Sequence, residues 1–138
     1  MSDRVYIALG SNLGDRSANL GRARTAIASL KNVRVVAESI VEETEPLGPV
    51  PQGPYLNQMI AVETDLTPRQ LLGALQRIER AAGRVRVVKW GPRTLDLDIV
   101  MIEGKEFVDD ALTVPHPELP NRDFWKRELE ELRGALHV

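Results

Sequence analysis

Residues 5–9 read Val-Tyr-Ile-Ala-Leu and are followed by Gly10. A short apolar run that ends at a turn residue is typical of a buried β-strand. After it, Asp15 can cap a helix over residues 16–31, where apolar residues recur at helical spacing. This stretch therefore predicts a strand that leads into an amphipathic helix, and the rest of the chain extends that unit.

Further segments continue the pattern: strands at 33–43, 57–65 and 95–102, and a helix at 68–82. The second helix begins with a capping box at Thr67 and Gln70, and Gly83 suits its end. A short strand at 105–108 and a helix at 122–133, capped by Asn121, complete the pattern. The order is that of the split βαβ motif. We predict an α+β fold, a ferredoxin-like βαββαβ antiparallel sheet with helices packed on it, as a single domain over residues 1–138.

The composition excludes several classes of protein. The chain has 138 residues, a net charge of −2 and no cysteine, so disulfides and cysteine-based metal sites are excluded. Proteins that bind nucleic acid or an anionic membrane non-specifically are usually basic overall, and this chain is not. No apolar run approaches the ~18 residues that span a bilayer, and the N-terminus has no secretory leader pattern. We expect a cytoplasmic monomer that binds small molecules, and neither nucleic acid nor membrane.

The strongest local signal is the sequence Leu-Asp-Leu-Asp-Ile-Val at residues 95–100. Side chains at i and i+2 of a strand share a face, so Asp96 and Asp98 point one way and the leucines point into the core. Two neighbouring carboxylates repel each other unless a cation lies between them, and Mg²⁺ prefers such oxygen ligands. On this pattern alone, a pair of solvated surface aspartates is an equally good interpretation.

A basic segment precedes the aspartates. Residues 80–95 contain Arg80, Arg84, Arg86, Lys89 and Arg93 and no acidic residue. Arginine forks match phosphate oxygens, although a charge run is more often a solvated loop paired with acids elsewhere. Phosphoryl transfer requires basic side chains that bind phosphate next to carboxylates that bind a metal ion. Residues 10–14 lack the lysine and glycine spacing of a Walker A loop and indicate a strand-to-helix turn.

Other candidate residues are ambiguous on their own. Residues 44–55 hold four of the nine prolines, and long ordered loops tend to be functional. Tyr55 and Phe124 are core residues or stacking faces for a flat ligand, and core is the simpler interpretation. His116 lies between two prolines and is more often a loop residue than a catalyst.

The segment Lys-Trp-Gly-Pro-Arg-Thr-Leu-Asp-Leu-Asp-Ile at residues 89–99 resembles the signature of the 6-hydroxymethyl-7,8-dihydropterin pyrophosphokinase family. Flanking blocks also resemble that family in order and spacing: residues 5–15, 44–49, 55–57, 76–79, 112–116 and 121–124. The resemblance covers about residues 4–125, and a signature of this length with such flanking blocks is highly specific.

The resemblance implies ATP-dependent transfer of pyrophosphate to the hydroxymethyl group of a reduced pterin, with release of AMP, in folate biosynthesis. It implies two Mg²⁺ ions held by Asp96 and Asp98. It also implies a pterin sandwiched between Tyr55 and Phe124. The family positions that would read the pterin edge are Thr44, Asn57 and the backbone around Leu47. The family positions that line the nucleotide site are Gln76, Glu79, Arg84, Arg86, Trp90, Arg93, Ile99, Thr113, His116 and Arg122.

We expect Arg84, Arg86 and Arg93 to stabilise charge that develops on the phosphates, beside the metal-binding aspartates. The proline loop and residues 84–94 would act as covers that exclude water. The sequence departs from the family pattern in a shorter loop after Arg86, in Pro117 and in a short segment after Phe124.

Two other functions are compatible with the residues alone. One is a different two-metal nucleotide phosphotransferase or nucleotidyl transferase on a ferredoxin-like sheet. The other is a non-catalytic ligand-binding module that regulates another protein.

Overall fold

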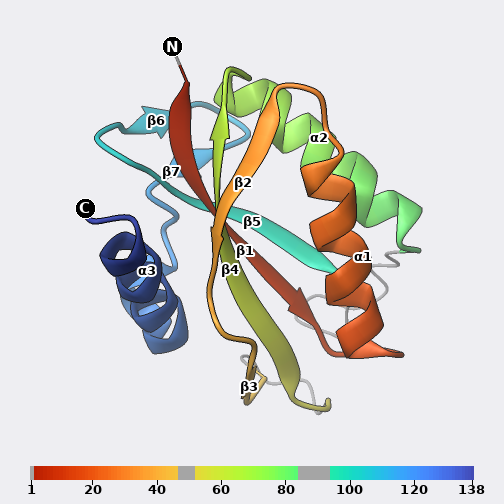
Figure 1. The fold of residues 1–138 in the computed structure, drawn as a ribbon. Coiled ribbons are helices and arrows are strands. Elements are labelled where there is room, and N and C mark those ends of the chain that lie inside the picture. Colours follow the sequence, from red (N-terminus) through yellow and green to blue (C-terminus); the bar gives the residue numbers. More distant parts are fainter. Residues whose placement is uncertain (1, 47–51, 84–93) are drawn as a thin grey trace.

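A computed structural model describes residues 2–46, 52–83 and 94–138 and shows a mixed α+β architecture (Figure 1). The strands are β1 (Asp3–Ser11), β2 (Val33–Glu38), β3 (Glu42–Thr44), β4 (Tyr55–Thr64), β5 (Asp96–Ile102), β6 (Phe107–Val108) and β7 (Thr113–Val114). The helices are α1 (Arg16–Ala28), α2 (Pro68–Ala81) and α3 (Asp123–Ala135), with a 3₁₀ turn at Leu119–Asn121. Among these residues, no helix is long and apolar enough to cross a membrane.

The main sheet has the order β2-β4-β1-β5, and β3 pairs with the other end of β4. Each of these pairings is antiparallel. The first four long strands in the chain therefore take the positions of a ferredoxin-like sheet, and the predicted fold class is confirmed. A separate ribbon forms from β6 and β7, of which residues 105–108 predicted the first strand.

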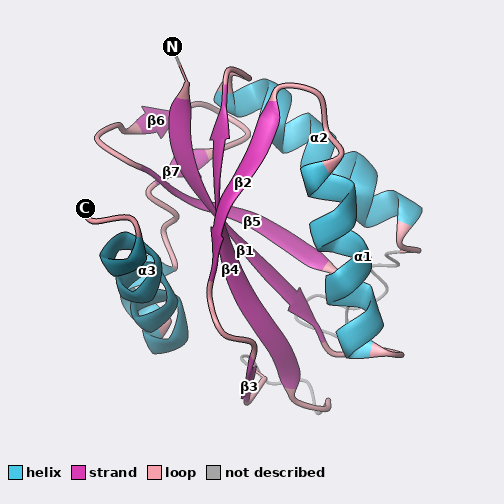
Figure 2. Cartoon of the chain, in the orientation of Figure 1, coloured by secondary structure: helices cyan, strands magenta, loops and turns pink. Residues whose placement is uncertain are grey.

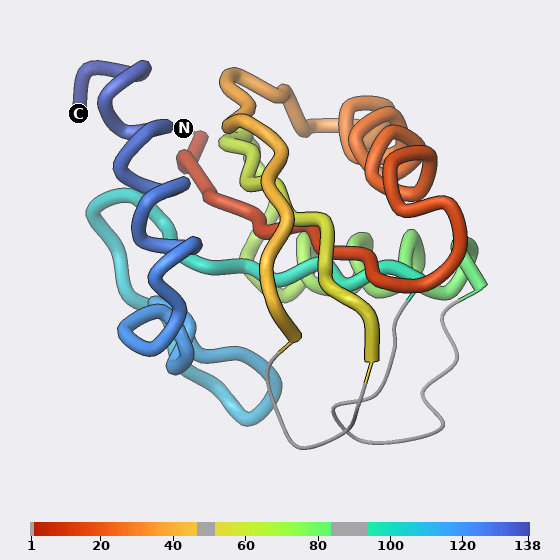
Figure 3. The backbone as a smooth tube through the Cα atoms, turned by 90° about the horizontal axis from the view of Figure 1, so that it is seen from below, coloured from red at the N-terminus to blue at the C-terminus, as the bar shows by residue number. Residues whose placement is uncertain are grey.

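The two faces of the sheet pack against different helices (Figure 2). On one face, Val5, Ile7 and Leu9 of β1 join a buried cluster with residues of α1 and α2. On the other face, Tyr6 and Ala8 join a cluster with Trp125 and Leu132 of α3. Figure 3 shows α3 at one side of the strands and α1 at the other. Because β1 is covered on both faces, it is apolar at nearly every position rather than alternating.

Local signals fixed the helix starts as predicted. The Asp15 side chain accepts a hydrogen bond from the Ala18 backbone N–H at 3.1 Å. Thr67 and Gln70 form both bonds of the capping box before α2. Gly83 follows α2 with a φ of 78°, the left-handed conformation that a glycine adopts without strain.

Several element ends differ by one to three residues from the sequence predictions; for example, the helix expected over 16–31 ends at Ala28. Two further differences are larger. The strand expected at 33–43 is divided into β2 and β3, because Ser39 Oγ accepts a hydrogen bond from the Met59 backbone N–H at 2.9 Å and interrupts the regular ladder. Asn121 does not cap α3: it lies in the 3₁₀ turn, and its side chain donates to Glu118 at 3.2 Å. Helix α3 begins with no side-chain cap, and its burial against the sheet supplies its stability instead.

Candidate active site

Asp96 and Asp98 stand at the beginning of β5, on the sheet face that α3 covers. Their neighbours Leu95, Leu97 and Ile99 are buried in the cluster on the opposite face, with α1 and α2. Asp98 lies opposite Ala8 of β1, and Ala8 belongs to the α3-side cluster. The side chain of Asp98 is 38% exposed, so it reaches solvent from an otherwise buried strand. The alternation predicted from the sequence is confirmed.

Gly10 of β1 separates the aspartates from a second polar group on the same face. It pairs with Asp96 on one side and with Asn57 of β4 on the other. A Cβ atom on Gly10 would lie 3.3 Å from Asn57 Oδ1 and 3.3 Å from Tyr55 Cδ1. A glycine within a strand often marks a close approach, and here it leaves room between the amide and the carboxylate.

Tyr55, Asn57 and Thr44 form that second group. Tyr55 Oη donates to Asp96 Oδ2 at 3.5 Å, and Asn57 Nδ2 donates to Thr44 Oγ1. Thr44 pairs with Tyr55 in the β3–β4 ladder, so the three side chains share one face. The structure therefore brings the predicted pterin-edge residues Thr44 and Asn57 into contact with each other. It also brings the predicted stacking residue Tyr55 into contact with Asp96, one of the predicted metal ligands.

His116 joins the site from the loop after β7. Its backbone N–H donates to the Val100 carbonyl at 2.8 Å, which holds the loop on the outer edge of β5. Its Nε2 lies 3.8 Å from Asp98 Oδ1. Burial, and then the nearby Arg122 cation, lower the pKa of His116, so the ring is neutral near pH 7. Nδ1 accepts from the Glu118 backbone N–H at 3.0 Å, so the proton is on Nε2 and faces Asp98.

Aromatic residues at the start of α3 complete this side of the site. Trp125 is 2% exposed and packs edge-on against His116, with ring centroids 4.9 Å apart. The Arg122 guanidinium lies 4.3 Å from the Trp125 ring centroid, a cation–π contact. Phe124 is half-buried, and its ring centroid lies 6.3 Å from that of Trp125. The buried tryptophan thus contacts three residues that were predicted to bind substrates: His116, Arg122 and Phe124.

Glu79 of α2 holds β5 from its outer edge. Its side chain is buried, and Oε2 accepts a hydrogen bond from the Leu97 backbone N–H at 2.8 Å. Leu97 lies between the two aspartates, so Glu79 fixes the segment that presents them. Because β5 is an edge strand of the main sheet, this N–H meets no neighbouring strand on that side among the residues that the structure describes.

The remaining predicted residues are more scattered. Gln76 is exposed on α2 and Thr113 is exposed on β7. The Ile99 side chain is buried in the core on the face opposite the aspartates, so the structure does not bring it to this site. Leu47, Arg84, Arg86, Trp90 and Arg93 lie outside the described residues.

Asn19 is a further buried residue near the site that no sequence pattern indicated. Its Nδ2 is 3.1 Å from Ser11 Oγ, 3.0 Å from the Leu13 carbonyl and 3.3 Å from the Thr94 carbonyl. It therefore ties the end of β1 to the residues that enter β5. An asparagine inside a helix gives no periodic signal, so only the tertiary structure shows this role. Gly10 was interpreted as part of a turn, although a glycine next to a strand was a usable signal.

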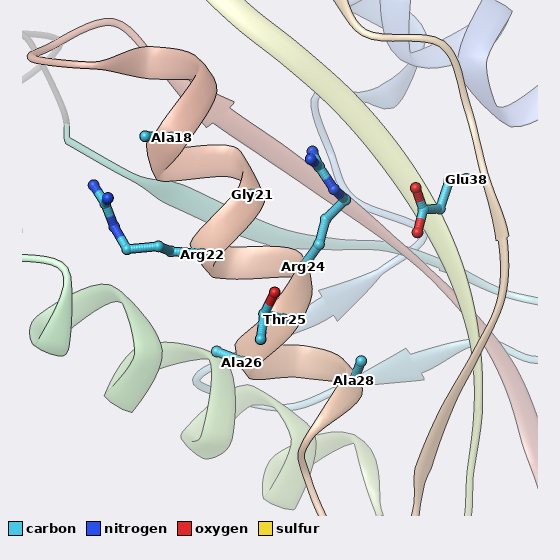
Figure 4. A pocket seen from close by; sticks show the side chains of 8 residues that line it. All are labelled: Ala18, Gly21, Arg22, Arg24, Thr25, Ala26, Ala28 and Glu38. Carbon is cyan, nitrogen blue, oxygen red and sulfur yellow. The ribbon is translucent and has the colours of Figure 1, made fainter.

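A hollow of about 790 Å³ lies elsewhere, on the outer surface of α1 next to Glu38 (Figure 4). Its two arginines already have partners, because Arg22 donates to Asn19 at 2.5 Å and Arg24 donates to Gln58 at 2.8 Å. It includes none of the predicted site residues. The α3 face therefore remains the candidate site.

The donor set on that face fits a hard divalent cation. Within residues 2–46, 52–83 and 94–138, no group of three or more His, Cys, Asp or Glu residues could hold a metal ion. Mg²⁺ usually takes one or two carboxylates and completes its shell with water and substrate phosphates. Asp96 and Asp98 match that requirement better than they match Zn²⁺, which takes three or four protein ligands.

The sequence was then compared with known proteins. The family model described as 7,8-dihydro-6-hydroxymethylpterin-pyrophosphokinase (HPPK) matches residues 6–134. The chain belongs to the HPPK family. Among its curated relatives are proteins named 2-amino-4-hydroxy-6-hydroxymethyldihydropteridine pyrophosphokinase. That of Haemophilus influenzae is 45% identical, over 96% of this chain and 82% of the relative. Those of Pseudomonas aeruginosa and Bacillus subtilis are 44% and 40% identical, over 100% and 96% of this chain and 85% and 79% of theirs.

Membership of the HPPK family confirms the resemblance found from the sequence. The signature at residues 89–99 and the aspartate pair at its end lie within the matched region.

Proposed function

We propose that this HPPK family member transfers pyrophosphate from ATP to the hydroxymethyl group of 6-hydroxymethyl-7,8-dihydropterin and releases AMP, in folate biosynthesis. Family membership makes the chain an ATP-dependent pyrophosphokinase. The observation that carries the reaction is the placement of Asp96 and Asp98 on one sheet face beside Tyr55, Asn57 and Thr44. Carboxylates for a metal-bound triphosphate and polar groups for a heterocycle edge thus lie next to each other.

In this proposal Asp96 and Asp98 hold two Mg²⁺ ions. When bound, such ions neutralise charge on the triphosphate and help to ionise the attacking hydroxyl. The chain's own residues orient what surrounds them. Tyr55 Oη, 3.5 Å from Asp96 Oδ2, restrains that carboxylate, and the neutral His116 directs its Nε2–H toward Asp98. In the same proposal the phosphates meet positive charge from Arg122, Arg84, Arg86 and Arg93. The nucleotide is lined by Gln76, Glu79, Trp90 and Thr113, but not by the buried side chain of Ile99.

The pterin would lie between Tyr55 and Phe124. A flat ring between two aromatic faces buries apolar area and gains stacking energy. The Asn57 side chain both donates and accepts hydrogen bonds, as the edge of a pterin requires, and its contact with Thr44 fixes the orientation of the amide. The backbone around Leu47 would complete the edge contacts. We further propose a single pyrophosphokinase domain that works as a cytoplasmic monomer on small-molecule substrates.

The direct test is to incubate the protein with ATP, Mg²⁺ and the hydroxymethyl dihydropterin and to identify the nucleotide product. AMP supports the proposal. ADP indicates another phosphotransferase, and the absence of nucleotide turnover indicates a binding module.

Asp96→Ala tests the role of the aspartates. We expect loss of AMP formation by a factor of at least about 10³, because a metal ligand is removed from the reaction centre. The fold should survive, since Asp96 reaches solvent at the start of a strand. Asp110→Ala is a matched control, because that acidic side chain is 93% exposed and belongs to none of the proposed sites. Full turnover by Asp96→Ala, with AMP as product, would overturn the proposed mechanism.

A further inference from the structure

An arginine occupies the first turn of α1, where a helix favours negative charge. Arg16 is the first residue of the helix, and this end of a helix carries a partial positive charge from its unpaired N–H groups. The Asp15 side chain already caps the helix. A cation at this position does not stabilise α1, so the reason for the arginine lies in what its side chain contacts.

The guanidinium of Arg16 joins two segments that lie 27 and 38 positions further along the chain. Its Nη1 donates to Glu43 Oε1 of β3 at 2.8 Å and to the Pro54 backbone carbonyl at 3.0 Å. That carbonyl belongs to the peptide bond that leads into Tyr55, the first residue of β4. One nitrogen of Arg16 therefore links β3 to the start of β4.

The two residues before Pro54 are held from the same turn of the chain. Asn12, which follows β1, donates through Nδ2 to Gln52 Oε1 at 2.6 Å and to the Gly53 carbonyl at 3.2 Å. Residues 52–54 lie outside any helix or strand, so side-chain bonds such as these fix their position. Each of the three residues thus accepts a hydrogen bond from Asn12 or Arg16.

These contacts lie behind the proposed pterin site. Thr44 and Tyr55 form the end pair of the β3–β4 ladder, on the face that would meet the pterin. Glu43 faces the other way, since it pairs with Leu56, whose side chain packs against the core cluster under α1 and α2. A strand of three residues makes a weak ladder by itself. Arg16 supports the end of that ladder from the side away from the ligand.

We propose that Arg16 is a positioning residue for the pterin: it holds Thr44 and Tyr55 at the spacing that the flat ring needs. It does so through its bonds to Glu43 and to the Pro54 carbonyl. The proposal rests on the proposed function and deepens it. Without these bonds the end of the ladder opens more readily, so the form of the site that binds the pterin is less populated and the apparent affinity falls.

The alternative role for an arginine beside this site is direct contact with the phosphates of ATP. The structure favours positioning, because both bonds of Arg16 Nη1 go to protein acceptors and the Glu43 carboxylate already balances its charge. The two roles affect different substrates. Positioning acts on the KM for the pterin, and phosphate binding acts on the KM for ATP.

The test is the steady-state kinetics of AMP release by Arg16→Met, which keeps the length of the side chain and removes its donors. We expect the KM for the hydroxymethyl dihydropterin to rise about tenfold, with the KM for ATP and kcat unchanged. Arg16→Lys restores a charged donor and should recover most of the pterin affinity. An unchanged pterin KM in Arg16→Met, or an equal rise in the KM for ATP, would overturn the proposal.

A double-mutant cycle tests whether the contact with Glu43 carries the effect. Glu43→Ala leaves the bond to the Pro54 carbonyl in place, so the pterin KM should rise by less than in Arg16→Met. Adding Glu43→Ala to Arg16→Met should cause no further rise, because the two side chains act through one contact. Effects of the two substitutions that simply multiply would overturn the proposal.

Arg34→Met is the matched control, because Arg34 pairs with Glu63 near the opposite end of β4. It removes the same charge and the same kind of ion pair, and its kinetic constants should equal those of the wild type. The urea midpoint of Arg16→Met should also stay unchanged, since partly exposed ion pairs contribute little to stability. Should Arg16→Met fail to fold, Glu43→Ala carries the test, and an unchanged pterin KM in that variant overturns the proposal.

The outcome also separates this inference from the proposed function. A wild-type protein that releases no AMP would overturn both. Release of AMP by the wild type, together with an unchanged pterin KM in Arg16→Met, would overturn only the role of Arg16.

Discussion

At the scale of single residues, the site depends on Gly10, which has no side chain. Gly10→Ala would place a methyl group 3.3 Å from both Asn57 Oδ1 and Tyr55 Cδ1. These neighbours must shift by a few tenths of an ångström, and small displacements in a binding site are costly. We expect the KM for the pterin to rise roughly tenfold, with little change in the KM for ATP, in steady-state assays of AMP release.

Gly134→Ala is the control for this substitution, because no atom lies within 4 Å of the Cβ it would add. Its kinetic constants should match those of the wild type. An equal loss of ATP and pterin affinity in Gly10→Ala would contradict the assignment of Asn57 and the Tyr55 ring to the pterin.

At the scale of elements, α2 and β5 are joined by one buried hydrogen bond, from the Leu97 backbone N–H to Glu79 Oε2. Glu79→Ala leaves that N–H without its acceptor, so the free energy of unfolding should fall by about 1–3 kcal/mol in urea titrations. Turnover should fall as well, because Leu97 lies between Asp96 and Asp98. Glu79→Gln keeps an oxygen acceptor and should recover most of the stability.

The glutamine variant also distinguishes two roles for Glu79. A stable Glu79→Gln with normal turnover would mean that the residue acts by holding β5. A stable variant with impaired turnover would mean that its charge acts on the nucleotide. A Glu79→Ala protein as stable as the wild type would contradict the role of Glu79 in holding β5.

The sequence predicted the elements whose signals are local. The cap at Asp15, the capping box at Thr67 and the alternation around Asp96 involve neighbours within four residues, so their patterns are visible in the chain. The break at Ser39 was not predictable, because it depends on a bond to a strand 20 residues away. Likewise, Glu128 looks like a surface residue of α3 until tertiary packing buries it.

Much of the candidate site came from resemblance rather than from residue patterns. Composition and spacing favoured core positions for Tyr55 and Phe124 and a loop role for His116. The structure shows why those simpler interpretations were incomplete: Tyr55 reaches Asp96, and His116 reaches toward Asp98, through contacts that cross 41 and 18 positions of the chain.

At the scale of the whole molecule, buried and paired acids set the dependence of stability on pH. The folded chain keeps a proton on Glu128 between pH 4.5 and about pH 9, where the unfolded chain has released it, so stability falls as pH rises through this window. The lowered pKa of His116 has the opposite sign, and its contribution is lost as pH falls below 6.5. Above pH 6.5 only the Glu128 contribution remains, so these two groups make stability fall from there toward pH 9.

The loss of stability at low pH depends on Glu63 of β4, which pairs with arginines on the two neighbouring strands. It accepts a hydrogen bond from Arg4 of β1 at 2.9 Å and pairs with Arg34 of β2. The bond from Arg4 is the main cause that lowers the pKa of Glu63 below 4.5. A lowered pKa means that the contribution is present above pH 4.5 and is lost as pH falls through the folded-state pKa.

We therefore expect Glu63→Gln to lose stability at pH 6 but to show a flatter decline between pH 5 and pH 3 than the wild type, in urea unfolding followed by circular dichroism. Glu106→Gln, an exposed acid outside this network, should keep the wild-type slope. Glu63 is the member of this group that takes up a proton between pH 5 and pH 3, so its removal must reduce the dependence of the free energy of unfolding on pH. The same pH dependence in Glu63→Gln and the wild type would show that the pairing of Glu63 with Arg4 and Arg34 does not control acid unfolding.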